Sequence, residues 1–240
     1  MKALEILDWE VELIDIRSFD WTASEPLPDW RLVFNRIAAR PADDDAALLT
    51  KACDLLAAVE VGGIPCLNGA GCHAVGVSKA LQASLLSRIG LPTPWTQPVS
   101  YEDWQEKLDQ VDADMPVLIK PNTGGRGRGI SSPEDVGAET CAPVLQERSE
   151  SGDGRIHRVE KLGGEILYEA TAPLATERFD YCLAGAEEDS LTFTAELSEE
   201  TVSACQRIAE SALLDLGSIE YLIDEEGRPW FIDINPVSSY

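Results

Sequence analysis

The chain has 240 residues, of which 44% are hydrophobic and 26% are charged, a balance typical of a globular protein and not of a disordered one. Its 43 acidic and 19 basic residues give a formal charge of -24, which argues against nucleic acids and anionic membranes as partners. No apolar run is long enough to span a bilayer, and acidic residues interrupt residues 1–15, so neither a membrane span nor a secretory signal is indicated. We therefore expect a cytoplasmic protein whose cysteines are reduced.

The first half of the chain alternates helix and strand signals. An Ala/Leu-rich helix is predicted over residues 43–59, ended by a Gly-Gly pair, and a short strand follows over residues 64–68. Ser78 is a suitable N-cap for a helix over residues 79–89, and Gly90 is a suitable residue to end that helix.

The second half is richer in strands and hairpins. A short helix capped by Ser100 is predicted over residues 101–111, and an amphipathic helix over residues 198–216. Strands are predicted over residues 116–121, 143–147, 155–162, 164–171, 218–224 and 229–235. The last two of these should pair about a turn at residues 224–227. Helices interleaved with hairpins indicate an α+β architecture and not a parallel doubly wound sheet.

Three oxygen-bearing side chains near the C-terminus form a candidate metal site. If the last two strands pair, Glu220 lies across from the region of Asp233, and Asn235 projects from the same face as Asp233 because the two are two residues apart. Mg²⁺ prefers oxygen ligands and takes only a few of them from protein. The alternative is a solvated strand face, which an isolated Asp-x-Asn pattern favours. The apolar neighbours of Asp233 favour the metal site, since a carboxylate among apolar residues needs a partner.

Basic residues are scarce, so those near glycine-rich or helix-start segments are candidates for binding phosphate. Lys120 lies on a predicted strand that leads into a loop over residues 122–129, where glycines allow backbone N–H groups to approach phosphate oxygens. The loop contains Gly124, Gly125, Arg126, Gly127, Arg128 and Gly129. Lys79 begins a helix, and Arg158 lies in a hairpin strand. A hairpin tip, a helix-surface lysine and a surface arginine are the alternative interpretations.

In this order the segments resemble the ATP-grasp superfamily, and most closely its RimK-like branch, which contains glutamate ligases acting on ribosomal protein and peptides. The likeness covers about residues 33–238 and rests on FNR, SKALQASLL, IKPNTGG, RVEKLGGEILYE and IEYLID…FIDIN. It implies an α+β ATP-grasp fold in which two α/β subdomains clasp ATP. The implied divisions are a short N-terminal segment at residues 1–70 and an ATP-grasp domain at residues 71–240, with lobes over about residues 71–145 and 146–240.

The resemblance also implies roles for individual residues. Those expected to bind ATP are Lys79, Lys120, Gly124, Gly125, Arg126, Gly127, Gln146, Glu147 and Arg148, the last three by contact with adenine. Those expected to bind Mg²⁺, or Mn²⁺ in its place, are Glu220, Asp233 and Asn235. The residues expected beside the reacting phosphoryl group are Arg158 and Lys120. The implied activity is ADP-forming ligation of a carboxylate to the amine of an amino acid or peptide through an acylphosphate.

Two alternatives would use the same nucleotide site, namely a non-catalytic nucleotide-binding relative and a phosphotransferase. Arg126 and Arg128 stand where this group more often has small residues, so we expect the loop either to close differently or to bind a second anion. Relatives usually run on through a further helix, whereas this chain ends at Tyr240. We therefore expect a compact or truncated member, or a substrate site completed by another chain, which leaves a homo-oligomer open.

Overall fold

The computed structural model describes residues 8–22, 24–37, 46–100, 102–123, 129–135, 143–174 and 190–237. Its helices are α2 (Ala46–Val61), α3 (Ala70–Val77), α4 (Lys79–Arg88), α5 (Trp104–Leu108) and α6 (Glu199–Ser211), with a 3₁₀ turn, η1, at Pro133–Asp135. Its strands are β1 (Val33–Phe34), β2 (Cys66–Leu67), β3 (Thr96–Pro98), β4 (Val117–Pro121), β5 (Pro143–Glu147), β6 (Arg155–Leu162), β7 (Glu165–Pro173), β8 (Thr192–Thr194), β9 (Leu216–Ile223) and β10 (Pro229–Asn235). Within these ranges, every helix is too short or too polar to cross a membrane.

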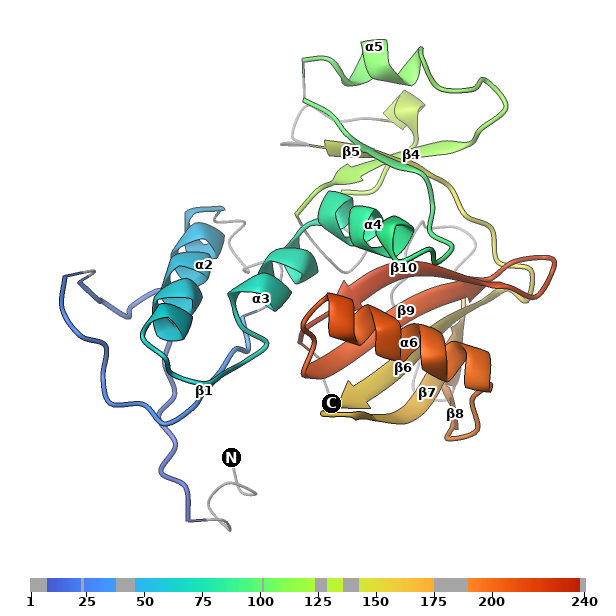
Figure 1. The fold of residues 1–240 in the computed structure, drawn as a ribbon. Coiled ribbons are helices and arrows are strands. Elements are labelled where there is room, and N and C mark those ends of the chain that lie inside the picture. Colours follow the sequence, from blue (N-terminus) through green and yellow to red (C-terminus); the bar gives the residue numbers. More distant parts are fainter. Residues whose placement is uncertain are drawn as a thin grey trace.

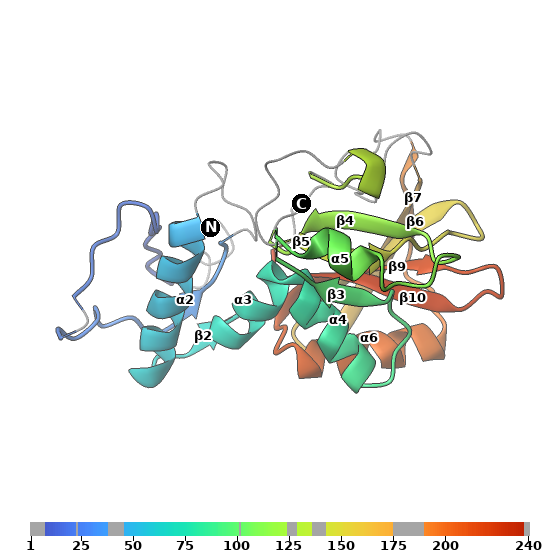
Figure 2. The same cartoon turned by 90° about the horizontal axis from the view of Figure 1, so that it is seen from above.

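The strands form three separate sheets (Figures 1 and 2). The parallel pair β1–β2 lies beside α2 and shares a small apolar core with it. A three-stranded antiparallel sheet has the order β3-β5-β4, and a five-stranded antiparallel sheet has the order β10-β9-β6-β7-β8. Helix α4 lies between β10 and the three-stranded sheet, so the segments that begin α4, end β4 and end β10 meet between the two larger sheets.

The main core lies between the five-stranded sheet and α6, with α3 and α4 completing it at the β10 edge. Its most deeply buried members are Cys72, Leu86, Val159, Cys205, Ile208, Ala212, Ile219, Phe231 and Ile234. Alternate residues of β6, β9 and β10 face this core, so the intervening residues face the opposite side of the sheet. That opposite side carries the polar side chains of the candidate site.

Helix signals are confirmed at α4 and corrected at α5 and α6. Ser78 caps α4, since its hydroxyl accepts from Leu81 N at 3.2 Å, and Gly90 follows the helix with φ +70°. The N-cap of α5 is Asp103 and not Ser100. Their side chains instead bond each other's backbone, with Ser100 N donating to Asp103 Oδ1 at 2.7 Å and Asp103 N to Ser100 Oγ at 3.2 Å.

The predicted helix over residues 198–216 is too long. Helix α6 ends at Ser211, and Leu216 already begins β9. Leu213 adopts a left-handed conformation with φ +54°, and Leu214 N donates to Ala209 O at 2.8 Å, a hydrogen bond typical of a helix C-terminus. Glycine usually occupies such a left-handed position after a helix. Because residue 213 is leucine, the sequence carries no glycine to indicate where the helix ends.

Candidate functional site

Three candidate residues form one row across adjacent strands. Glu220 on β9 pairs with Arg158 on β6 and with Asp233 on β10. The predicted hairpin and the position of Glu220 across from Asp233 are therefore confirmed. A register shift lies between Phe231 and Asp233, so these two residues face opposite sides of the sheet although they are two positions apart. Phe231 pairs with Tyr221 and faces α6, whereas Asp233 pairs with Glu220 and faces away from α6.

A second row lies two residues further along the same face. Ser218 on β9 pairs with Glu160 on β6 and with Asn235 on β10. Glu160 is 3% exposed, and the side-chain oxygen of Ser218 is buried without a hydrogen-bond partner among the described residues. Asn235 therefore lies on the face that carries Asp233, as the two-residue spacing predicts.

Both candidate lysines reach this face from other elements. Lys79 begins α4, and its ammonium pairs with Asp233 Oδ1 at 2.5 Å. Lys120 lies on β4, and Asn122 just after that strand connects it to the start of α4. Lys79 N donates to the backbone oxygen of Asn122, and Ala80 N donates to its side-chain oxygen, each at 2.9 Å. Asn122 thus fixes the position of the Lys120 strand relative to Lys79. No local sequence pattern predicts this role for Asn122.

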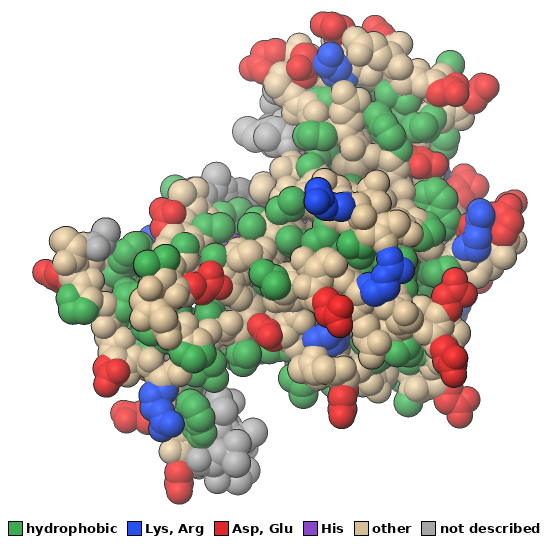
Figure 3. Space-filling model, viewed as in Figure 1, with side chains coloured by type: hydrophobic (Ala, Val, Ile, Leu, Met, Phe, Trp, Pro, Cys, Tyr) green, Lys and Arg blue, Asp and Glu red, His purple; other side chains and the backbone are tan. Residues whose placement is uncertain are grey.

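Arg158 lies between two carboxylates. Its Nε donates to Glu160 Oε1 at 2.7 Å, and its Nη1 donates to Glu220 Oε1 at 3.2 Å. The three side chains are 14%, 4% and 6% exposed. With Asp233 and the two lysines, the site contains three carboxylates and three cations, whereas acidic side chains predominate among the charged ones on the face shown in Figure 3. The site is thus close to neutral within a strongly acidic chain.

Burial and neighbouring charges shift the protonation of these groups. Burial, with Asp233 beside it, raises the pKa of Glu220 to about 7 against the opposing effect of Arg158. Burial and the charge of Lys79 lower the pKa of Lys120 to about 7, although Asp233 opposes them. Burial alone would raise the pKa of Asp233, but Lys79 and Lys120 bring it below its ordinary value. Asp233 is therefore held as a carboxylate by the lysines around it.

The donor set suits a hard metal ion. Glu220 and Asp233 supply carboxylate oxygens, and Asn235 supplies an amide oxygen. No group of three or more His, Cys, Asp or Glu side chains in the described ranges is arranged around a common point. Two carboxylates and an amide still suit Mg²⁺, because this ion usually keeps waters and phosphate oxygens in its shell. Lys79 and Arg158 form ion pairs with these same carboxylates.

Two side chains that the sequence analysis did not identify hold the C-terminal end of β10. Gln82 on α4 donates through Nε2 to Ile234 O at 3.0 Å, between the two candidate ligands of β10. Asn68 donates through Nδ2 to Pro236 O at 2.6 Å and to Leu216 O at 2.7 Å. Gly76 on α3 packs so closely on Pro236 that a Cβ there would lie 2.4 Å from its ring. These contacts fix the backbone on both sides of Asn235.

The predicted adenine-binding segment lies at the end of β5. Gln146 is buried, and its Nε2 donates to Thr96 Oγ1 at 2.8 Å. The backbone N–H groups of Glu147 and Arg148 donate to neighbouring carbonyl oxygens, each at 2.8 Å. The contact of this segment with adenine stays a prediction. The predicted phosphate-covering residues Gly124, Gly125, Arg126 and Gly127, with Arg128, lie outside the described residues.

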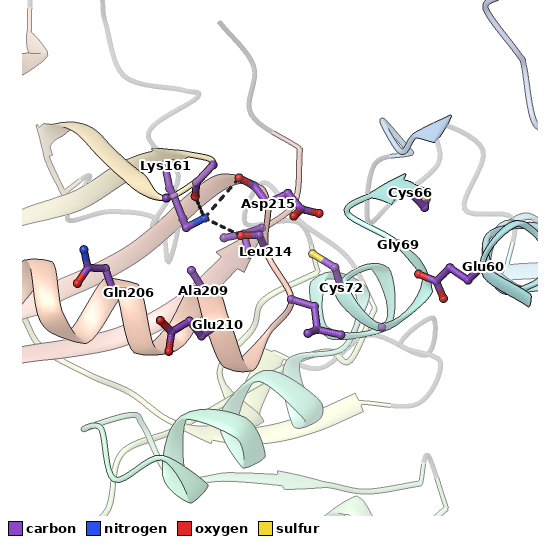
Figure 4. Close-up of a pocket in the computed structure, with 14 residues that line it drawn as sticks. Glu60, Cys66, Gly69, Cys72, Lys161, Gln206, Ala209, Glu210, Leu214 and Asp215 are labelled. Atoms are coloured by element: carbon purple, nitrogen blue, oxygen red, sulfur yellow. Dashed lines mark hydrogen bonds between the residues drawn. The ribbon is translucent and has the colours of Figure 1, made fainter. Parts of the chain in front are cut away.

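A cavity of about 620 Å³ lies between α3, α6 and the β6–β7 turn, and Figure 4 shows it in close-up. The ammonium of Lys161 donates there to the backbone oxygens of Leu214 at 2.8 Å and Asp215 at 3.4 Å, so its donors are engaged. Burial raises the pKa of the Cys72 thiol to about 12, which makes it unreactive near neutral pH. Burial likewise raises the pKa of the Cys66 thiol to about 11, so the described residues that line this cavity include no free cation and no reactive thiol.

His157 faces the α6 side of the sheet, opposite Arg158. Its ring bonds Asp153 Oδ2 at 2.8 Å and Glu169 Oε1 at 3.2 Å and stacks on Tyr221. Burial lowers the pKa of His157, but the hydrogen bonds with the two carboxylates outweigh it and bring the pKa above its ordinary value. His157 is therefore part of a buried network apart from the candidate site.

The sequence of this chain is similar to the sequences of known ligases. No family model matches the chain. It is 26% identical over 196 residues to a D-alanine–D-alanine ligase of Laribacter hongkongensis, covering 75% of this chain and 63% of that protein. It is 27% identical over 228 residues to a D-alanine–D-alanine ligase of Methylococcus capsulatus, covering 85% of this chain and 68% of that protein. A RimK-domain ATP-grasp protein of Sphaerobacter thermophilus superposes with a TM-score of 0.68 at 16% identity, covering 99% of this chain and 85% of that one.

Proposed function

We propose that this chain, which has the ATP-grasp fold, is an ATP-dependent ligase that joins a carboxylate to an amine. The fold expected from the sequence, and its likeness to RimK-like ATP-grasp proteins, are confirmed. The chain spans 63% of the length of the first ligase to which it is similar, so the proposed activity rests on the site. The observation that carries it is the convergence of Lys79, Lys120 and Arg158 on the row formed by Glu220 and Asp233.

Each group has a role that suits phosphoryl transfer. Glu220, Asp233 and Asn235 would hold Mg²⁺, which when bound supplies positive charge to the transferring phosphoryl group. Lys79 and Lys120 bind phosphate oxygens and are positioned by the α4 cap and by β4. Such catalysis depends on positioning and electrostatic stabilisation and needs no protein nucleophile.

In the proposed reaction, a carboxylate oxygen of the substrate attacks the γ-phosphorus of ATP. The bond from that phosphorus to the bridging oxygen breaks, and ADP leaves with the electron pair. The lone pair of the amine then attacks the acyl carbon of the acylphosphate. An amide forms, phosphate leaves with the electron pair of the C–O bond, and the proton of the amine goes to solvent. Arg158 donates to the oxygens of the transferring group, and the amine belongs to an amino acid or peptide.

The test is product analysis with ATP, Mg²⁺ and a panel of amino acids and short peptides. The ligase forms ADP, phosphate and an amide that requires both a carboxylate and an amine, detected by mass spectrometry. A stable phosphorylated product would indicate a phosphotransferase, and no product with tight nucleotide binding would indicate a non-catalytic relative. Mn²⁺ should replace Mg²⁺ because it accepts the same oxygen ligands.

A matched pair of variants tests the metal row. Asp233→Asn should abolish Mg²⁺-dependent turnover, because it removes a carboxylate ligand and the partner of Lys79. Asp109→Asn, an exposed position at the end of α5, serves as the control and should keep wild-type turnover. Undiminished Mg²⁺-dependent turnover in Asp233→Asn would remove the proposed metal site.

A further inference from the structure

Arg158 has two carboxylate partners that differ in their surroundings. Glu220 lies beside Asp233 in the row of candidate metal ligands. Glu160 lies on the same strand as Arg158, two residues further along, in the row of Ser218 and Asn235, and β9 separates it from Asn235. The shorter bond is to Glu160, at 2.7 Å against 3.2 Å for Glu220. The arginine is therefore attached to one carboxylate that is a proposed metal ligand and to one that is not.

A metal ion at Glu220 would compete with the guanidinium of Arg158 for the same carboxylate oxygens. Mg²⁺ attracts a carboxylate strongly, and a guanidinium that shares that carboxylate loses part of its interaction. The bond from Nε to Glu160 does not involve Glu220, so it would remain available with a metal ion bound at Glu220. It also leaves the Nη groups at the end of the guanidinium directed toward Glu220 and the metal row.

We propose that Glu160 is a positioning residue, which holds Arg158 in place for the reacting phosphoryl group once Glu220 is engaged by the metal. This inference rests on the proposed function. The hydrogen bond orients the guanidinium through its Nε, and the burial of Glu160 restricts the rotamers of both side chains. Glu160 itself contacts neither the metal nor the substrate.

The first test separates turnover from binding. Glu160→Ala removes the partner of Arg158 Nε, so kcat should fall by about 10- to 100-fold while KM for ATP stays within about twofold, as expected when a transition-state contact alone is lost. Glu160→Gln retains an oxygen that accepts from Arg158 Nε and should recover most of the lost kcat. Glu165→Ala, at an exposed position at the start of β7, is the matched control and should match the wild type. Unchanged kcat in Glu160→Ala would overturn the inference.

The second test does not depend on turnover. Mn²⁺ affinity, measured by electron paramagnetic resonance, should be the same in Glu160→Gln and in the wild type, whereas a large loss would make Glu160 a metal ligand and overturn the inference.

The Nε–H signal of Arg158 in a nitrogen–proton correlation spectrum, identified by its loss in Arg158→Lys, reports on the hydrogen bond between Arg158 and Glu160. The spectrum is recorded with Mg²⁺ in place of Mn²⁺ and with a non-hydrolysable ATP analogue. Under these conditions the Arg158 Nε–H should remain protected from solvent exchange in the wild type and in Glu160→Gln. It should lose that protection in Glu160→Ala.

These readouts distinguish the two proposals. If the wild-type chain forms no amide with any substrate, the proposed function fails. The Mn²⁺ titration and the Arg158 signal still decide whether Glu160 holds the arginine. If the amide forms and the Arg158 signal is unprotected in the wild type, the inference about Glu160 fails and the proposed function stands.

Discussion

Asn68 offers a test of how the N-terminal part of the chain is joined to the five-stranded sheet. Its side-chain Nδ2 donates to the backbone oxygens of Leu216 and Pro236, at 2.7 and 2.6 Å. Its Oδ1 accepts from the backbone N–H groups of Asp215 and Leu216, at 2.9 and 3.3 Å. The residue is fully buried and has φ +53°. Asn68→Ala therefore removes four hydrogen bonds and places alanine, which tolerates the left-handed conformation less well than asparagine does, at this position.

The expected cost follows from these contacts. The three shorter bonds contribute about 1 kcal/mol each, and leaving their buried partners unsatisfied raises the loss toward the upper end of the range. The left-handed conformation adds about 1 kcal/mol for alanine. We expect Asn68→Ala to lower the free energy of unfolding by about 3–5 kcal/mol, a large share of the stability of a typical domain. Asn68→Gly should lose less, because glycine adopts this conformation without steric cost.

Urea denaturation followed by circular dichroism measures the change, provided that the m-value matches the wild type. Gln110→Ala is the control, because the Gln110 side chain is exposed and makes one local bond to Glu106 at 3.3 Å. It should change the unfolding free energy by less than about 0.5 kcal/mol. A loss below about 1 kcal/mol in Asn68→Ala would refute the reasoning, because it would mean that the buried partners of Asn68 find other hydrogen bonds.

Three further predictions concern packing, phosphate binding and pH. Gly76→Ala places a Cβ 2.4 Å from the ring of Pro236 and should cost about 1–3 kcal/mol in urea denaturation, whereas Gly164→Ala, which meets open space, should cost little. Lys120→Met should weaken binding of an ATP analogue by about tenfold or more in calorimetry, and unchanged affinity would argue against its phosphate contact. His157→Gln should flatten the pH dependence of stability above pH 6.5. The raised pKa of His157 gives stability that is fully present below 6.5 and lost as the pH rises through the folded-state pKa.

The parts of the site that local pattern encodes could be predicted from the sequence. Two alternating strands about a short turn place Glu220 across from Asp233, and the spacing of Asp233 and Asn235 places them on one face. The register shift in β10 was not predictable, since no glycine or proline lies within PWFIDIN after its first residue. The register shift allows both Phe231 and Ile234 to pack in the core against α6 while Asp233 faces the other side of the sheet.

The polar side chains that join separate elements could not be predicted in the same way. Asn68, Gln82 and Asn122 are ordinary polar residues in sequence, and each acts on backbone groups far along the chain. Such contacts carry no periodicity and no local spacing, so they become visible only when the elements are placed in space. Glu160 was missed for a different reason. In an alternating strand it resembles any charged residue on an exposed face, and only the register of β6 against β9 reveals that the face is buried.

The ion pairs of the candidate site indicate what kind of ligand fits it. A metal ion alone would take Asp233 and Glu220, and so would remove the carboxylate partner of Lys79 and one of the two carboxylate partners of Arg158 in a buried place, which is costly. A polyphosphate alone would take the two cations and leave the two carboxylates unpaired. Only a ligand that brings positive and negative charge together replaces both sets of partners at once. Under the proposed function, a chain with a charge of -24 would therefore bind a polyphosphate with its metal through a site that is itself nearly neutral.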